Sequence, residues 1–401
     1  MSTARAAHAH HDVQTPVGGT VMTGWMQILL AIAAFGLAVI AYRLVFGIGA
    51  IAVLNDGYTW GPWKTVSIIV LTAWASGGYA VALLVYVFNK EQFHGLARTA
   101  ILTSAVGYTA GVITLGFDIG KPWNFWRLIL VNHWNLHSVL LEVAVCISIY
   151  IVFLWLEMAP PLLDGWKQGP AGPLRRIAID WTPRLEQALP YIVAMAIVLP
   201  SMHQSSLGSL MMLAGPRLHS YWQTPLLPLL FLISCWLLGF AFVIVASMAS
   251  SLAWNRPLQM NGLAGIARIT SWIIFVFAVV RVADLLARGQ FVVVPFSGYS
   301  VLVIAEFVFL LAPALMLRNA DVQTLPQRLF LGAMAVLIGG GLYRLDVALI
   351  GFMPGSAYSY FPSVMEMSVS LGFTALAVAT YIYIVKRFPI LPAPSAHGSA
   401  A

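Results

Sequence analysis

Charged side chains are scarce in this sequence: they make up 9% of its 401 residues, whereas 60% of the residues are apolar. A soluble globular domain carries about 25% charged residues, so this composition excludes a soluble protein and indicates an integral membrane protein. Cysteine is scarcer still, with only Cys146 and Cys235. Both lie in apolar runs and form no CxxC pair, so we expect no iron–sulfur cluster in this chain. Any iron–sulfur carrier would then belong to another subunit.

Apolar runs long enough to cross about 30 Å of hydrocarbon recur along the chain. They cover residues 24–46, 64–88, 98–118, 136–158, 189–214, 224–252, 265–287, 297–317, 328–350 and 365–385. Helices satisfy their own backbone hydrogen bonds in lipid without closing a barrel. The sequence therefore predicts an all-α polytopic membrane protein of about ten transmembrane helices.

Three segments are expected along the chain: a disordered tail at residues 1–23, a membrane domain at 24–387 and a second tail at 388–401. A faint repeat relates Asp118, Ser138 and Glu142 to Asp284, Ser300 and Glu306. It favours two four-helix bundles plus extra helices.

Lys and Arg residues are unevenly divided between the loops. The odd-numbered loops carry chiefly Lys64, Lys121, Arg127, Arg217 and Arg288, and most of the others lie in the tails and the even-numbered loops. The excess of basic residues marks the cytoplasmic side, so we predict that both termini are cytoplasmic and that the chain lies in a bacterial inner membrane. The opposite loops are rich in aromatic residues, which are typical of an interfacial belt and could also dock a periplasmic partner.

Ionisable side chains inside the apolar runs are candidates for function, because each costs at least about 2.5 kcal/mol to insert. At 1.5 Å per residue, Asp118 falls at the outer end of its helix, Glu142 about 9 Å deep and His203 about 16 Å deep. The sequence therefore predicts a polar site in the outer half of the membrane.

A second group of charges, Arg281, Asp284, Glu306 and Arg344, falls in the seventh to ninth expected helices, together with Asp346. They are interpreted either as structural ion pairs or as a second polar cluster. His133 and His137 are spaced to share a helical face, but no third ligand is evident, so we expect no metal site.

Several long strings of mixed polarity resemble the polysulfide-reductase (NrfD-like) membrane subunits and, within that family, the hydrogenase-2 membrane subunit HybB. They include FDIGKPWN (117–124), LPSMHQSSLGSLM (199–211) and YSYFP (358–362), and the likeness covers nearly the whole chain. It implies a subunit without haem that takes menaquinone or ubiquinone as its substrate. Electrons would come from a periplasmic, ferredoxin-like iron–sulfur subunit, fed by the small and large subunits of a NiFe hydrogenase.

Two alternatives stay open at this point. The chain could serve another quinone-linked oxidoreductase, such as one for sulfur compounds or formate. It could also be a secondary transporter, whose function would equally require charges inside the membrane.

The resemblance also implies roles for individual residues. Tyr108, Glu142 and His203 correspond to the catalytic, proton-handling positions, and the same three residues together with Asp118 correspond to the quinone-binding ones. Ala246 departs from the family pattern, because it stands where the hydrogenase type has a glutamate in the motif VIFE. Between the third and sixth helices, the inner half of the membrane carries hydroxyl side chains but no Asp, Glu or His. Hydroxyl groups do not hold an extra proton near pH 7, so we predict weak or absent proton translocation.

Overall fold

The computed structural model describes residues 13–290 and 296–394. Within these residues, ten helices or helical runs are long and apolar enough to cross a membrane, which confirms the predicted class. Nine are single helices: α2 (Gly24–Phe46), α6 (His94–Asp118), α7 (Val139–Lys167), α8 (Pro173–Met212), α9 (Leu227–Ala253), α10 (Met260–Ala287), α11 (Gly298–Arg318), α13 (Pro326–Leu345) and α14 (Val364–Arg387).

The second membrane span is interrupted and consists of five short pieces. They are α3 (Pro62–Lys64), the π-helical η2 (Thr65–Val70), α4 (Leu71–Trp74), α5 (Gly77–Ala82) and the π-helical η3 (Leu83–Val87). A glycine is required where α5 crosses α9, because a Cβ at Gly77 would lie 2.8 Å from the carbonyl oxygen of Gly239. Small residues permit this close approach of membrane helices.

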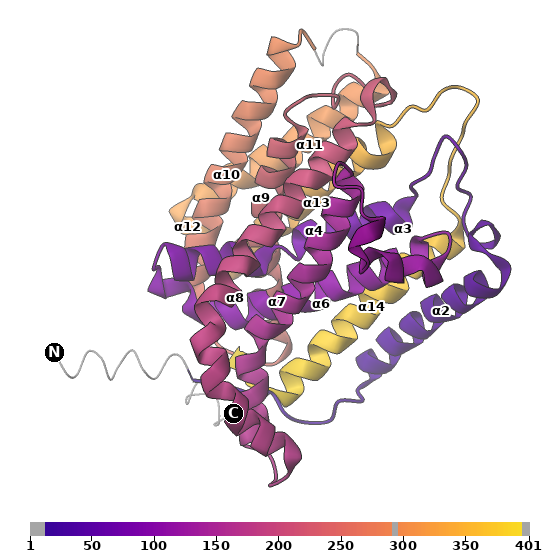
Figure 1. The fold of residues 1–401 in the computed structure, drawn as a ribbon. Coiled ribbons are helices and arrows are strands. Elements are labelled where there is room, and N and C mark those ends of the chain that lie inside the picture. The colour runs from indigo at the N-terminus through magenta and orange to yellow at the C-terminus, as the bar shows by residue number, and fades with distance from the viewer. Residues whose placement is uncertain (1–12, 291–295, 395–401) are drawn as a thin grey trace.

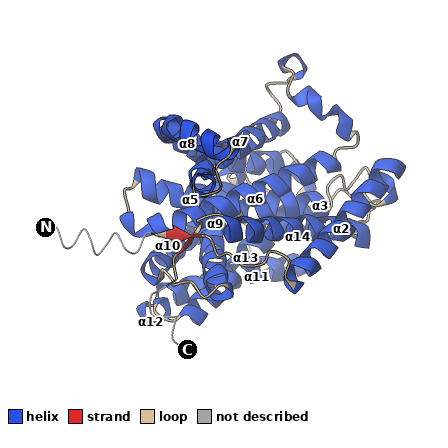
Figure 2. Ribbon diagram, turned by 90° about the horizontal axis from the view of Figure 1, so that it is seen from below, coloured by secondary structure: helices blue, strands red, loops and turns tan. Residues whose placement is uncertain are grey.

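The helices form two four-helix bundles (Figure 2). The second span, α6, α7 and α8 make the first bundle. The second bundle contains α9, α10, α11 and α13, which η8 (Asp346–Ile350) continues. The remaining helices α2 and α14 pack on each other at Gly36 and Gly372, where a Cβ on Gly36 would come within 2.9 Å of the partner's Cα. Two bundles plus extra helices agree with the prediction.

The two ends of the described chain lie together. Strand β1 (Gln14–Thr15) pairs antiparallel with β2 (Leu391–Pro392), and Arg256 donates to Thr15 Oγ1 at 2.9 Å and to the Pro392 carbonyl at 3.0 Å. Residues 13–18, part of the expected disordered tail, are therefore held by backbone hydrogen bonds to residues 385–393. Residues 1–12 and 395–401 of the expected tails lie outside the described residues. We refer to the side with these ends as the inner side and to the opposite side as the outer side.

Short helices complete the loops: α12 (Ala320–Gln323), η1 (Ile48–Ala50), η4 (Glu91–Phe93), η5 (Pro122–Leu128), η6 (Val131–His133) and η7 (Gly215–Arg217).

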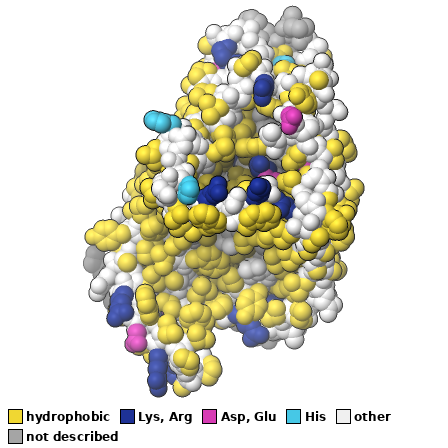
Figure 3. Space-filling view, turned by 45° about the vertical axis from the view of Figure 1, so that its right-hand side comes forward, with side chains coloured by type: hydrophobic (Ala, Val, Ile, Leu, Met, Phe, Trp, Pro, Cys, Tyr) yellow, Lys and Arg dark blue, Asp and Glu magenta, His cyan; other side chains and the backbone are white. Residues whose placement is uncertain are grey.

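The hairpin of α7 and α8 projects past the other helices at the inner side (Figure 1). Figure 3 shows a broad hydrophobic surface, with basic side chains gathered around a hollow above it. Such a surface suits contact with lipid.

Candidate functional site

Tyr108 of α6 and His203 of α8 meet inside the first bundle. The Tyr108 hydroxyl lies 3.0 Å from His203 Nε2, and both side chains are completely buried. The ring of Tyr150 on α7 packs edge-on against Tyr108, with 4.7 Å between the ring centroids. The structure thus brings together two of the four predicted site residues.

Three further polar residues, Gln204, Ser76 and Thr72, extend this contact. Gln204 Nε2 donates to the Tyr108 hydroxyl at 3.2 Å and to Thr72 Oγ1 at 3.2 Å. Ser76 Oγ lies 3.1 Å from the Tyr108 hydroxyl. We call Tyr108, His203, Gln204, Ser76 and Thr72 the core network. The sequence did not single out these three additions, and only the run HQSS pointed to Gln204.

The core network has a free donor and a free acceptor. His203 Nδ1 and Gln204 Oε1 have no hydrogen-bond partner among the described residues. In the tautomer whose Nε2 accepts from the Tyr108 hydroxyl, Nδ1 carries the proton and can donate to a carbonyl oxygen. Leaving a buried donor such as this N–H unpaired costs about 1–3 kcal/mol. A ligand whose acceptor atom takes this hydrogen bond would offset that cost.

Glu142 lies nearer the outer end of its helix than predicted. The prediction started the helix at residue 136, whereas α7 begins at Val139, because Ser138 caps it by accepting from the Leu141 amide at 3.3 Å. Glu142 is therefore exposed in the first turn, where the helix dipole favours a carboxylate. Its Oε1 accepts from the Ser206 hydroxyl at 2.6 Å. Ser206 is one turn from His203, so Glu142 adjoins the core network without touching it.

Asp118 is not part of the core network. It is the last residue of α6, ten residues or about 15 Å along the helix from Tyr108. Its carboxylate pairs with Lys64 Nζ at 2.7 Å. Arg43 of α2 donates to the carbonyl of Ile119 at 2.5 Å beside this pair. Both basic residues were missed as site residues, because the sequence does not show that α2 and α3 meet the end of α6.

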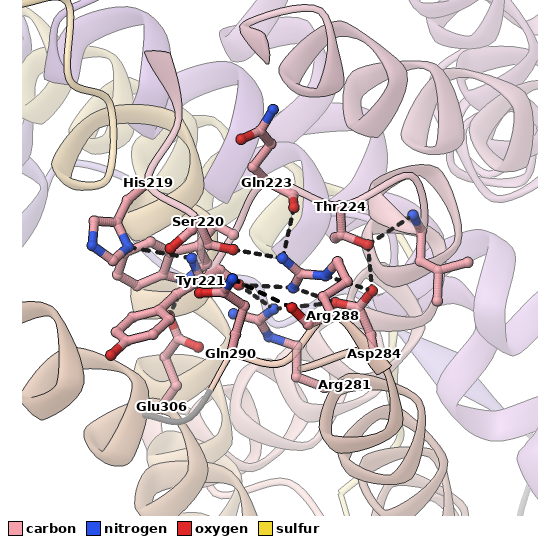
Figure 4. Close-up of polar contacts among 12 residues, drawn as sticks. His219, Ser220, Tyr221, Gln223, Thr224, Arg281, Asp284, Arg288, Gln290 and Glu306 are labelled. Carbon is pink, nitrogen blue, oxygen red and sulfur yellow. Dashed lines mark hydrogen bonds and ion pairs between the residues drawn. The ribbon is translucent and has the colours of Figure 1, made fainter. Parts of the chain in front are cut away.

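The expected second-bundle cluster forms in part (Figure 4). Trp222 Nε1 donates to Glu306 Oε1 at 2.8 Å, and Arg281 Nη1 lies 3.8 Å from Asp284 Oδ2. Asp284 makes a shorter contact with Arg288, at 2.6 Å. Arg281 also donates to the carbonyl of Tyr221 at 2.7 Å, so this cluster ties α10 and α11 to the loop before α9.

Arg344 does not join that cluster, and this corrects the predicted grouping. Its guanidinium donates to the carbonyls of Ile69 and Phe231, both at 2.7 Å, and to Ser234 Oγ at 3.1 Å. Ile69 lies in the π-helical η2, where the altered hydrogen-bond pattern leaves a carbonyl available. Arg344 therefore fastens the second bundle to the first.

His133 and His137 do not share a helical face. His133 ends η6, and His137 precedes α7 in an irregular segment, so the spacing of four residues has no helical meaning. Both side chains are exposed.

An apolar cavity of about 430 Å³ lies between α4, α6, α9 and α14. Ala246 lines it, so the position where a glutamate was expected faces an apolar space in this chain. Gly107 and Ala75, the neighbours of Tyr108 and Ser76, form part of the wall. The cavity therefore borders the helices that carry the core network.

Ten spans around buried polar groups define a multi-pass integral membrane protein with a polar site inside the membrane. Residues 51–353 match the family described as polysulphide reductase, NrfD, and the chain belongs to this family. The chain is 36% identical to the probable Ni/Fe-hydrogenase 2 b-type cytochrome subunit of Escherichia coli (strain K12), over 95% of this chain and 96% of that one. It is 23% identical to the menaquinone reductase integral membrane subunit of Nitratidesulfovibrio vulgaris, over 92% and 91%.

The name of the Escherichia coli relative contradicts the prediction of a subunit without haem, because a b-type cytochrome holds haem. That prediction is therefore wrong on this comparison. Histidine is a common axial ligand of haem iron, and His203 is the one completely buried histidine among the described residues. Its Nε2 is engaged by Tyr108, and His133 and His137 lie in an exposed loop. The side chains in this arrangement do not fit a haem between two helices, so no step below passes through one.

Proposed function

We propose that this chain is the quinone-reducing membrane subunit of a respiratory oxidoreductase complex of the NiFe hydrogenase-2 type. The similarity to two relatives, a hydrogenase subunit and a menaquinone reductase subunit, supports this class. The observation that carries the proposal is the core network: a buried imidazole and phenol joined at 3.0 Å, with His203 Nδ1 unpartnered among the described residues. Residues 24–387 act as one membrane domain in this proposal.

The reaction adds two electrons and two protons to a quinone, giving the quinol. In the proposal, an iron–sulfur subunit docks on the outer loops and supplies the electrons. His203 Nδ1 donates a hydrogen bond to one quinone carbonyl, which favours the negative charge that develops there on reduction. Tyr108 is in contact with the same imidazole and hands on protons.

Glu142 and Asp118 have different parts in this proposal. Glu142 is exposed and bonded to Ser206 at 2.6 Å, one turn from His203, so it can exchange protons with the outer side. Asp118 lies about 15 Å from Tyr108 along α6, too far for one quinone ring to touch both. Paired with Lys64, it holds the outer end of α6 beneath the loop that follows.

The test uses the purified complex with its electron-donating subunits. His203→Ala should lower quinone reduction at least 100-fold and leave reduction of a soluble dye through the partner subunits unchanged. His94→Ala, at an exposed histidine on α6, is the matched control. Quinone reduction at the wild-type rate in His203→Ala would rule out this site, and a complex that reduces no quinone would rule out the function.

The orientation is also part of the proposal, with the inner side facing the cytoplasm. The paired β1 and β2 put both ends of the membrane domain on one side, and the distribution of Lys and Arg assigns that side. A reporter fused after Arg387 should be cytoplasmic, and one inserted at 351–364 periplasmic. The opposite pattern would reverse the assignment of the electron-donor side.

A further inference from the structure

Glu157 of α7 is a carboxyl group inside the first bundle that the reaction described above does not use. Glu157 is 5% exposed, and neither of its carboxylate oxygens has a hydrogen-bond partner among the described residues. A buried acid in a membrane helix is costly, and such residues typically lie on ion or proton pathways.

Glu157 belongs to a stripe of titratable residues along α7. Tyr150, Glu157 and Asp164 follow one another at intervals of seven residues, which is nearly two turns, so they lie on one face of the helix. Tyr150 packs against Tyr108 of the core network. At the other end, the side chain of Asp164 is 39% exposed on the inner side, and its Oδ2 lies 3.9 Å from Arg98 Nη2. The stripe thus joins the inner surface to the core network.

Glu157 is not among the site residues expected from the sequence. The apolar run that contains it ends at residue 158, which would place Glu157 at the membrane surface. In the structure α7 continues to Lys167, so Glu157 is ten residues, or about 15 Å, from the inner end of the helix. The expectation of weak coupling depended on hydroxyl groups alone in the inner half, and it did not take this carboxyl into account.

The helix face between Glu157 and Tyr150 is apolar. Leu154 lies between Tyr150 and Glu157 on the helix face. A proton must therefore pass one apolar turn, which water can bridge between polar groups.

We propose that Glu157 is the relay that brings protons from the inner side to the core network during quinone reduction. This inference rests on the function proposed above. Electrons reach the quinone from the outer side, and the two protons that complete the quinol travel from Asp164 through Glu157 and Tyr150 to Tyr108 and His203. Each quinone reduced in this way transfers two positive charges from the inner to the outer half, so the reaction charges the membrane.

The experiment reconstitutes the complete complex in liposomes and records quinone reduction, membrane potential and lumenal pH together. The wild type should produce a potential, with protons taken from the inner side. Glu157→Gln should lower the charge moved per electron at least fivefold, while quinone reduction in the presence of an uncoupler stays within about twofold, because the protons then enter from the outer side by way of Glu142. Glu157→Asp should restore part of the charge movement, because it keeps a carboxyl group.

Glu186→Gln, an exposed acid on the inner part of α8, is the matched control and should behave as wild type. If Glu157→Gln does not assemble, infrared difference spectra on quinone reduction should show a carboxyl band in the wild type that Glu157→Asp shifts. An unchanged charge per electron in Glu157→Gln, or a wild type that reduces quinone without any potential, overturns the inference and leaves the proposed function standing. A wild type that reduces no quinone overturns the function itself.

Discussion

The first bundle buries a phenol, an imidazole, an amide and two hydroxyls that bond to one another, whereas the second bundle buries arginines and carboxyl groups. Tyr108 and His203 meet at 3.0 Å, and Gln204 reaches Tyr108 at 3.2 Å. In the second bundle, Arg281 bonds to a backbone carbonyl at 2.7 Å, and Glu306 accepts from an indole at 2.8 Å. An imidazole can gain or lose a proton and a hydroxyl can pass one along a hydrogen bond, whereas a buried arginine stays protonated.

This difference separates a region suited to proton exchange from one suited to structure. Removing one partner of a buried charged contact typically costs 3–5 kcal/mol, whereas a neutral hydrogen bond contributes about 1 kcal/mol. We therefore expect changes in the second bundle to act on assembly and changes in the core network to act on catalysis.

Arg344→Met should prevent accumulation of the folded subunit. The guanidinium is completely buried, and its loss leaves the carbonyls of Ile69 and Phe231 without their donor, which costs several kcal/mol by the scale for buried charged groups. The measurement is the amount of subunit extracted and its thermal inactivation. Arg318→Met, at an exposed arginine, should leave both unchanged. Normal accumulation of Arg344→Met would break the comparison.

Tyr108→Phe should lower quinone reduction by about 100-fold, the low end of the roughly 100- to 10,000-fold range for a group in acid–base catalysis, while the subunit still assembles. The variant removes the hydroxyl that joins His203, Gln204 and Ser76. Steady-state rates with quinone and with a soluble dye provide the measurement. Tyr79→Phe is the control, because its buried hydroxyl contacts Cys235 at 3.2 Å outside the core network. Equal loss in both variants would mean that the effect is structural.

The membrane architecture could be predicted because lipid forces an apolar run of fixed length for each crossing. The ends of the helices could not, because caps and loops decide them. Ser138 shortens α7 at one end and moves Glu142 into the first turn. The extension of α7 to Lys167 buries Glu157 at the other end. Both residues therefore lie at a different depth from the one that the apolar runs predict, and the depth decides which role each can have.

The contact between Tyr108 and His203 was within reach of the sequence, since both stand out as polar residues in apolar runs. The partners of Arg344 were not, because two of them are backbone carbonyls and one belongs to a π-helical segment. The pairing of Asp118 with Lys64 likewise depends on how α3 meets α6. A pattern of side chains does not reveal such contacts.

Glu142→Gln should have a smaller effect on quinone reduction, about threefold or less, because the amide still accepts from Ser206 and protons still reach the core network from the inner side. The measurement is the steady-state rate with quinone beside the rate with a soluble dye. Glu91→Gln, at an exposed acid on the inner side, is the control. A loss of more than about tenfold in Glu142→Gln alone would make the outer side the main source of protons.

The smallest effect is expected at the outer end of the second bundle, in the loop before α9. His219 Nδ1 accepts from the Tyr221 amide at 3.2 Å, and burial lowers the pKa of His219 below its usual 6.5. The pKa of this histidine is lower in the folded state than in the unfolded state. The protein therefore has its full stability above the unfolded pKa, and it loses stability as the pH falls toward the folded pKa, because only the unfolded state binds the proton in that range. Thermal inactivation of the wild type should therefore worsen below about pH 6.5, and His219→Gln should reduce this pH dependence by a shift of about 1 °C. His94→Gln, at an exposed histidine on the inner side, is the control. If His219→Gln also altered the rate of quinone reduction at constant stability, the second bundle would take part in catalysis, and the division between the two bundles would fail.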